Sequence, residues 1–316
     1  MAQLRDNGPK SSGNLADEVQ RLMSRLTDPD EDFVRSVCVQ LHQPPAIVLF
    51  TQNQIDDLRS LCSRECIPSL RSVLSVDRTF NLSSLFVTLM VFKNKRVVRR
   101  SSQEPPIFVG PLMLHGDGKL STYLHFFTTV NAALNGTVVD SSELVCDGVV
   151  TGSDEEQAIV AAANIAFPNS KHLFCMLHCK DNVRHQLSTI GVPTTVRESV
   201  LARLFGCNGI SESPDEVTMD NRTAELMQYV RQTNVDAVAY LQERILPKIV
   251  ANNRHKWTEQ WIGHHQWSNN NAESANHLLK LQVCIIMRLG QITLLCAPTR
   301  HLTYRQTNRW IIMAQQ

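Results

Sequence analysis

The sequence has no run of 18 or more apolar residues, which is the length that a helix needs to cross a bilayer. Residues 1–13 also lack the apolar core of a secretory signal peptide. The nine cysteines are odd in number and have no disulfide-framework spacing, so we expect thiols or occasional metal ligands. Together these absences favour an intracellular protein without a membrane partner.

Strong net charge is missing as well. The chain carries 31 basic and 30 acidic residues, a net charge of +1, which is little for a protein that binds DNA over a broad surface. The charge is uneven, however, and a local basic run can bind phosphates even in a neutral chain. A solvated hairpin end explains the run equally well. The run comprises Lys93, Lys95, Arg96, Arg99 and Arg100.

The length and composition predict one large or two ordinary domains, because 316 residues with 43% apolar side chains can bury a sizeable core. Residues 1–30 are polar and predict a disordered N-terminal arm with one amphipathic stretch. Residues 31–70 show helical spacing, for example at Ile55, Leu58 and Leu61, and predict a helical lead-in. The pattern changes at residue 71, where we expect the core to begin.

From residue 71 to 190 the pattern predicts three strands, then strands alternating with helices. The expected strands are 72–77, 85–92, 107–114, 144–150 and 172–176, and the expected helices are 122–134, 155–167 and a helix from 180 onward. This order is typical of a ribonuclease-H-like fold, an α/β architecture with a mixed five-stranded sheet flanked by helices.

Helical periodicity continues through residues 191–267, which is too long for a loop and predicts an α-helical insertion. Trp257, Trp261 and Trp267 are interpreted as packing this insertion rather than stacking on bases. Residues 268–283 predict a helix that carries Glu273, and residues 284–316 form a divergent tail.

Three carboxylates stand where core elements are expected to end: Asp77, Asp154 and Glu273. Phosphoryl transfer on a nucleic-acid strand needs charge neutralised on both the attacking and the leaving oxygen, which two divalent cations about 3.5–4 Å apart achieve. Mg²⁺ prefers oxygen ligands, so a few carboxylates and a substrate phosphate complete its shell. Three acids suffice for two ions when one of them bridges.

Two of the three acids also have a simpler explanation. Asp154 precedes an expected helix and fits an N-cap, while Glu273 fits a carboxylate that favours the positive end of a helix dipole. Asp147 is a rival for the second position, although its Asp-Gly pair is first of all a turn signal. Cys175 and His178 have the spacing of half a zinc site, but no second pair stands nearby, so a structural or supporting role is favoured over a metal role.

Taken in order, Asp77, Asp154, the Cys175-Met-Leu-His178 motif and Glu273 within Asn-Asn-Ala-Glu-Ser-Ala-Asn resemble the catalytic core of Mutator-like DNA transposases over roughly residues 70–282. The resemblance implies a D-D-E triad that binds Mg²⁺ or Mn²⁺ and cleaves and transfers DNA strands. It also implies transposon ends and target DNA as partners, a nuclear location and a helical insertion before Glu273. Self-association into a homo-oligomer stays open.

Two departures from the family pattern point to a truncated or domesticated copy. No zinc-binding DNA-recognition module precedes residue 70, and the segment after Val283 does not resemble the end of the family. The alternative to an active transposase is therefore a catalytically inactive, transposon-derived protein that binds DNA or other proteins.

Overall fold

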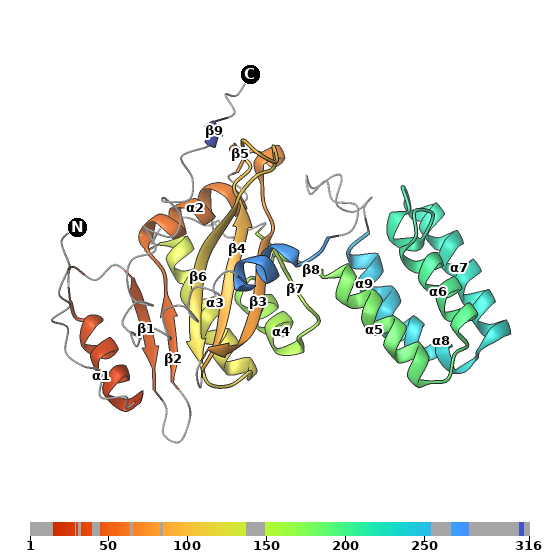
Figure 1. The fold of residues 1–316 in the computed structure, drawn as a ribbon, viewed down its shortest axis with the longest axis horizontal. Coiled ribbons are helices and arrows are strands. Elements are labelled where there is room, and N and C mark those ends of the chain that lie inside the picture. The colour runs from red at the N-terminus through yellow and green to blue at the C-terminus, as the bar shows by residue number, and fades with distance from the viewer. Residues whose placement is uncertain are drawn as a thin grey trace.

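The computed structural model describes residues 15–28, 30, 33–39, 45–63, 66–82, 85–136, 149–253, 267–277 and 310–312. Its centre is a seven-stranded sheet in the order β1-β2-β6-β4-β3-β7-β8, flanked by helices (Figure 1). The strands are β1 (Val34–Cys38), β2 (Ala46–Leu49), β3 (Leu74–Leu82), β4 (Leu85–Lys93), β6 (Ile107–His115), β7 (Val150–Ser153) and β8 (Lys171–Phe174).

The sheet is mixed and mostly antiparallel. The neighbouring strands β1, β2, β6, β4 and β3, in their order across the sheet, pair antiparallel. Strands β7 and β8 run parallel to β3. The α/β class and the mixed sheet are as expected, but the sheet has seven strands instead of five. The two additional strands, β1 and β2, lie in the segment expected to be a helical lead-in, and that expectation is wrong for them. The apolar spacing that suggested a helix belongs to α2 (Gln52–Cys62) alone.

One face of the sheet is covered by α2, α3 (Leu120–Asn135) and α4 (Gln157–Ala166) (Figure 1). Because side chains alternate along a strand, Leu74 and Val76 of β3 point into this core. They pack with fully buried aromatic residues of α3, including Phe126 and Phe127. The intervening positions of β3, including Asp77, therefore face the other side of the sheet.

The opposite face is covered more thinly, by α1 (Leu15–Arg25) and by a helix that includes residues 270–277. Leu22 of α1 packs with the strands, so the segment expected to be a disordered arm contains a docked helix; residues 1–14 lie outside the described part. In the second helix, Ala272 and Ala275 belong to the apolar cluster on this face of the sheet. Their small side chains bring the helix backbone close to the sheet.

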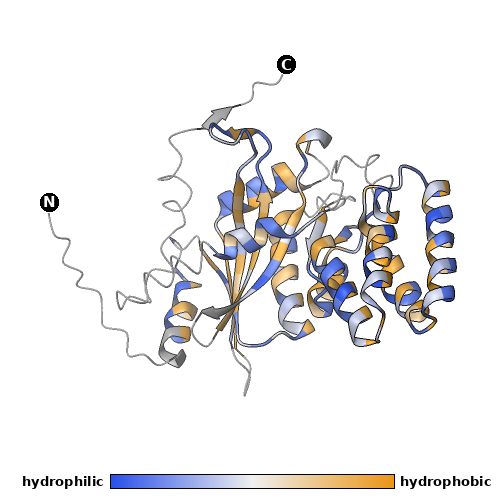
Figure 2. Ribbon diagram, turned by 45° about the vertical axis from the view of Figure 1, so that its right-hand side comes forward, coloured by the Kyte–Doolittle hydropathy of each residue, from blue (hydrophilic) through white to orange (hydrophobic). Residues whose placement is uncertain are grey.

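A bundle of helices follows β8 and forms its own apolar core (Figure 2). It contains α5 (Met176–Thr189), α6 (Thr194–Phe205), α7 (Glu216–Thr233), α8 (Asp236–Tyr240) and α9 (Leu246–Ala251), with a 3-10 turn, η2 (Ile210–Glu212), and a π-helical turn, η3 (Leu241–Ile245). Helical structure is thus found in the expected insertion up to Ala251. Residues 254–266, including Trp257 and Trp261, lie outside the described part.

A two-stranded ribbon stands apart from the main sheet. It pairs β5 (Val97–Arg99) with β9 (Trp310–Ile312), which joins the tail to the basic run. A short 3-10 helix, η1 (Pro68–Leu70), precedes β3. None of the described helices is both long and apolar enough to span a membrane.

Candidate metal centre

The register of the parallel strands places three functional side chains at one level of the sheet. Ser75 of β3 pairs with Gly152 of β7, and Gly152 pairs in turn with Leu173 of β8. Two residues further along each strand direction stand Asp77, Asp154 and Cys175. The carboxyl ends of parallel strands are where open α/β sheets collect ligands. The expected convergence of Asp77 and Asp154 thus follows directly from strand pairing.

Asp154 caps no helix. Helix α4 begins at Gln157, its N-cap residue is Glu156, and no side chain caps it by a hydrogen bond. The neighbouring acids are engaged elsewhere: Glu156 pairs with Arg78 at 3.2 Å, and Glu155 pairs with Lys248 at 2.9 Å. The simpler explanation of Asp154 as an N-cap is therefore wrong.

Glu273 reaches the site from the helix across the open face of the sheet. Ala272 and Ala275 fix the buried side of this helix, and Glu273 next to them lies at the exposed edge. Its carboxylate Oε1 lies 3.8 Å from Nε2 of His178. The three expected acids thus gather around one place, although they come from distant parts of the chain.

Two asparagines of the same segment hold the two aspartates. Nδ2 of Asn276 donates a hydrogen bond of 2.6 Å to Oδ2 of Asp77. Nδ2 of Asn269 donates to Oδ1 of Asp154 at 3.3 Å and to the Val76 carbonyl at 3.1 Å. Both asparagines are buried. Their role was not expected from the sequence, although their spacing of two helical turns in one polar motif could have suggested it.

The Cys-X-X-His motif stands at the start of α5 and lies within the site. Cys175 is the N-cap residue, and His178 follows one turn later. Nδ1 of His178 lies 2.8 Å from Oδ1 of Asp154, while Cys175 Sγ accepts a hydrogen bond of 3.3 Å from the backbone N–H of Asn269. Donor atoms of Asp154, Cys175, His178 and Glu273 all lie within 4.8 Å of one another, so this group could hold a metal ion. Cys175 is buried, Asp154 and His178 are partly buried, and Glu273 is exposed.

The electrostatics of the group favour a cation. Burial, and secondarily the charge of Asp154, raise the pKa of Asp77 to about 6, against a hydrogen bond from Asn276 that lowers it. Glu273 adds a further raising effect on this pKa. Burial also raises the pKa of the Cys175 thiol. A divalent cation among these carboxylates would offset their mutual repulsion.

Trp267 supports the helix that carries the third acid. Its ring packs on Gly152, where an added Cβ would lie 2.5 Å from ring atoms, and its carbonyl accepts from the Met176 amide at 3.0 Å. Trp267 shares a small apolar cluster with Val73 and Cys175. The interpretation that it packs the helical insertion is therefore wrong for this residue, which packs on the sheet.

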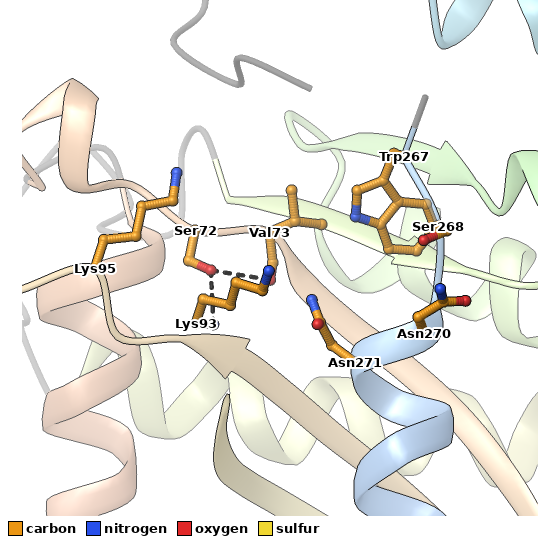
Figure 3. A pocket seen from close by; sticks show the side chains of 8 residues that line it. All are labelled: Ser72, Val73, Lys93, Lys95, Trp267, Ser268, Asn270 and Asn271. Atoms are coloured by element: carbon orange, nitrogen blue, oxygen red, sulfur yellow. Dashed lines mark hydrogen bonds between the residues drawn. The ribbon is translucent and has the colours of Figure 1, made fainter. Parts of the chain in front are cut away.

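The basic run divides into two parts. Lys93 and Lys95 line a pocket of about 250 Å³ beside the segment that leads to Glu273, whereas Arg96, Arg99 and Arg100 are exposed (Figure 3). The Lys95 ammonium donates to the Arg71 carbonyl at 2.6 Å, and Arg96 donates to the Ser60 carbonyl at 3.1 Å. The other lining residues are Ser72, Val73, Trp267, Ser268, Asn270 and Asn271. Asp147, the rival of Asp154, lies outside the described residues.

No known family model matches the chain, and a comparison with curated proteins finds no relative. What the structure defines is an α/β protein with a carboxylate, thiol and imidazole group that could hold a metal ion at the carboxyl ends of its parallel strands.

Proposed function

We propose that the protein is a metal-dependent polynucleotidyl transferase of the Mutator-like transposase type, acting in the nucleus on transposon ends and target DNA. The observation that carries the proposal is the gathering of Asp77, Asp154 and Glu273 from β3, the end of β7 and the helix at 270–277. Such a gathering has little structural benefit on its own, since like charges at short range destabilise a fold.

The topology supports the finer expectation of a ribonuclease-H-like core. Apart from the short β5, the elements follow the order β3, β4, β6, α3, β7, α4, β8, α5, which is the order that the sequence predicted. Within the sheet, β3 lies between β4 and β7 and is thus central among these strands. The first acid, Asp77, lies on this strand, and the second, Asp154, follows directly after the end of its parallel neighbour β7.

The residues of the chain fit Mg²⁺ or Mn²⁺, because three carboxylates offer the oxygen ligands that such hard cations prefer. In the proposed site Asp77 and Asp154 hold the ions and Glu273 completes the set. When bound, two such ions stabilise the attacking and leaving oxygens of an in-line displacement by water or by a 3′-hydroxyl. Asn276 and Asn269 orient the two aspartates, and His178 restrains Asp154 and Glu273.

The pocket beside the Glu273 helix supports a path for the DNA strand. Lys93 and Lys95 both line this pocket, and the ammonium group of Lys93 lies on the side of Asn271 (Figure 3). Ammonium groups attract phosphates without regard to sequence, so this pocket serves affinity rather than target choice. Ser72, which lines the pocket, stands five residues before Asp77 in the sequence. Five residues of extended strand span ~16 Å, which is the length of chain between the pocket and the first acid.

Nicking of supercoiled DNA in the presence of Mg²⁺ or Mn²⁺ tests the function. Asp77→Asn, Asp154→Asn and Glu273→Gln keep side-chain shape but lose charge, so each should lower the rate at least about a hundredfold, as removal of one charge-stabilising group does. Asp181→Asn, at an exposed aspartate of α5, is the matched control. All variants should keep the circular dichroism of the wild type.

Two results would change the proposal. Activity that survives Asp154→Asn but is lost in Asp147→Asn would assign the second position to Asp147. A wild-type chain that binds metal and DNA but never nicks would favour the inactive, transposon-derived binding protein.

A further inference from the structure

The donor set around His178 differs chemically from a purely magnesium-binding one. Asp154 and Glu273 offer hard oxygens, His178 offers an imidazole nitrogen, and Cys175 offers a sulfur. Mg²⁺ takes oxygen ligands almost alone, whereas Zn²⁺ takes sulfur, nitrogen and oxygen in a four-coordinate shell. Four residues with this mixture are a complete zinc ligand set.

The geometry is close to what such a shell needs. Metal–ligand distances of ~2.0–2.3 Å in a tetrahedron put neighbouring ligand atoms ~3.3–3.8 Å apart. The four donor atoms already lie within 4.8 Å of one another, so small side-chain movements would close the shell. The motif contributes two adjacent ligands because an N-cap residue and the residue three places later lie on the same side of the first helical turn.

His178 provides an independent observation. Its Nδ1 atom is buried and has no aligned hydrogen bond, yet it lies 2.8 Å from Oδ1 of Asp154. A buried polar atom without a hydrogen bond costs free energy unless another partner satisfies it. The His178 nitrogen and the Asp154 oxygen, which face each other without an aligned hydrogen bond between them, are suitably placed to bind one cation together.

We propose that Asp154, Cys175, His178 and Glu273 bind Zn²⁺, and that zinc at this position excludes the Mg²⁺ ions of the proposed catalytic centre. On binding, the Sγ–H bond of Cys175 breaks, its proton passes to solvent, and a zinc–sulfur bond forms. Asp154 and Glu273 belong to both ligand sets, whereas Asp77 is held by Asn276 and belongs to the magnesium set alone. Zinc is therefore an inhibitor of this site. The inhibition rests on the proposed function; the zinc binding does not.

Co²⁺ titration of the full-length chain tests the site, because cobalt replaces zinc and a cobalt–thiolate bond gives a strong near-ultraviolet charge-transfer band. The wild type should show this band and lose it on addition of Zn²⁺, but not on addition of the same concentration of Mg²⁺. Cys175→Ser should lack the band, and His178→Ala should weaken Co²⁺ binding at least tenfold. Cys179→Ala is the matched control, since this thiol of the same helix is buried in the bundle core outside the ligand group.

A band that persists in Cys175→Ser, or that disappears equally in Cys179→Ala, overturns the proposed site. Displacement of Co²⁺ by Mg²⁺ as readily as by Zn²⁺ overturns it too. Inhibition is then measured as the fraction of each variant's own Mg²⁺-dependent nicking that Zn²⁺ removes, and Cys175→Ser should need at least tenfold more Zn²⁺ than the wild type. Nicking without a thiolate band rejects the zinc site alone, whereas a band without nicking rejects the proposed catalysis alone.

Discussion

The sheet and the helical bundle contribute to the site in different ways. The sheet places Asp77 and Asp154 through strand register, which fixes neighbouring residues by backbone hydrogen bonds. The bundle has a separate apolar core, and α5 spans both regions: Val183 and Leu187 enter the bundle core, while Cys175 and His178 face the acids. The two aspartates and Cys175 thus depend on the register of the sheet, and the imidazole of His178 depends on how α5 is seated.

The two aspartates differ in their burial and in their contact with the bundle. Asp77 lies in the middle of β3, is mostly buried and has a raised pKa, whereas the Asp154 side chain is 35% exposed and contacts His178 of the bundle. A change at Asp77 therefore tests the sheet, and a change at Asp154 tests the junction between the sheet and the bundle.

The largest effect is expected from opening a cavity in either core. Phe126→Ala in the sheet core should cost ~3–5 kcal/mol, and Leu226→Ala in the bundle core ~2–5 kcal/mol. We expect Leu226→Ala to lower the urea concentration at which the bundle alone unfolds. Limited proteolysis and far-ultraviolet circular dichroism during urea unfolding measure this midpoint. Equal shifts of one common transition in both variants would show that the two regions unfold as a single unit.

A smaller effect is expected at the contact between β7 and the Glu273 segment. In Gly152→Ala the new methyl group would lie 2.5 Å from the Trp267 ring, so the ring must move, at a cost of ~1–3 kcal/mol. Because Asn269 stands two residues after Trp267, a movement of this ring should weaken the hydrogen bond from Asn269 to Asp154. Calorimetric titration should then show weaker metal binding.

The double variant Gly152→Ala with Trp267→Leu separates steric overlap from other causes. Leucine is smaller than the indole, so the alanine should cost less in this background than in the wild type. An equal cost in both backgrounds would mean that the contact does not explain the loss.

Much of the architecture could be predicted from the sequence because the signals were local. Strand-like runs indicated β4 and β6, and helical spacing indicated α3 and α4, all within a few residues of their observed bounds. The strands β1 and β2 were missed since they are short and stand next to the strong helical spacing of α2. Strand β1 pairs with β2, and β2 joins the sheet by pairing with β6, more than 50 residues later, which no local pattern expresses.

The site was only partly predictable for the same reason. Asp77, Asp154 and Glu273 were identified through their motifs, but Asn276 acquires its role only when its helix lies across the sheet and reaches Asp77. Trp267 was assigned to the wrong region. Its residue type predicts that the side chain is buried, but it does not predict against which surface the side chain packs. That surface is the bare backbone of Gly152, a tertiary contact.

The pKa of Asp77 sharpens the contrast between the two aspartates. Its folded-state pKa of about 6 exceeds the ordinary value of 3.8, so the native state binds more protons than the unfolded chain between these values. The stability of the metal-free protein should therefore fall as pH rises from 4 to 6. Asp77→Asn removes this fall, so the free energy of unfolding of the metal-free variant should exceed that of the wild type by roughly 1–3 kcal/mol at about pH 7.

Urea unfolding in the presence of a chelator measures this effect, with Asp181→Asn as the control. Added Mg²⁺ should reverse the order, since it stabilises the wild type and not the variant. A metal-free wild type whose stability rises steadily over the same pH window would contradict the burial and charge repulsion assigned to Asp77.

The smallest effect is expected from single basic residues, and it separates the pocket from the exposed ribbon. Lys93→Ala should weaken DNA binding by about the same factor on every sequence and should lower the salt dependence by about one phosphate contact, a slope change of ~0.7–0.9. Arg99→Ala and Arg100→Ala should act similarly if the strand follows the ribbon, and less if it follows the pocket. Lys119→Ala, whose ammonium pairs with Asp117 at 3.0 Å, is the control. Tight, salt-insensitive binding to one sequence would instead place a sequence reader in parts of the chain beyond this run.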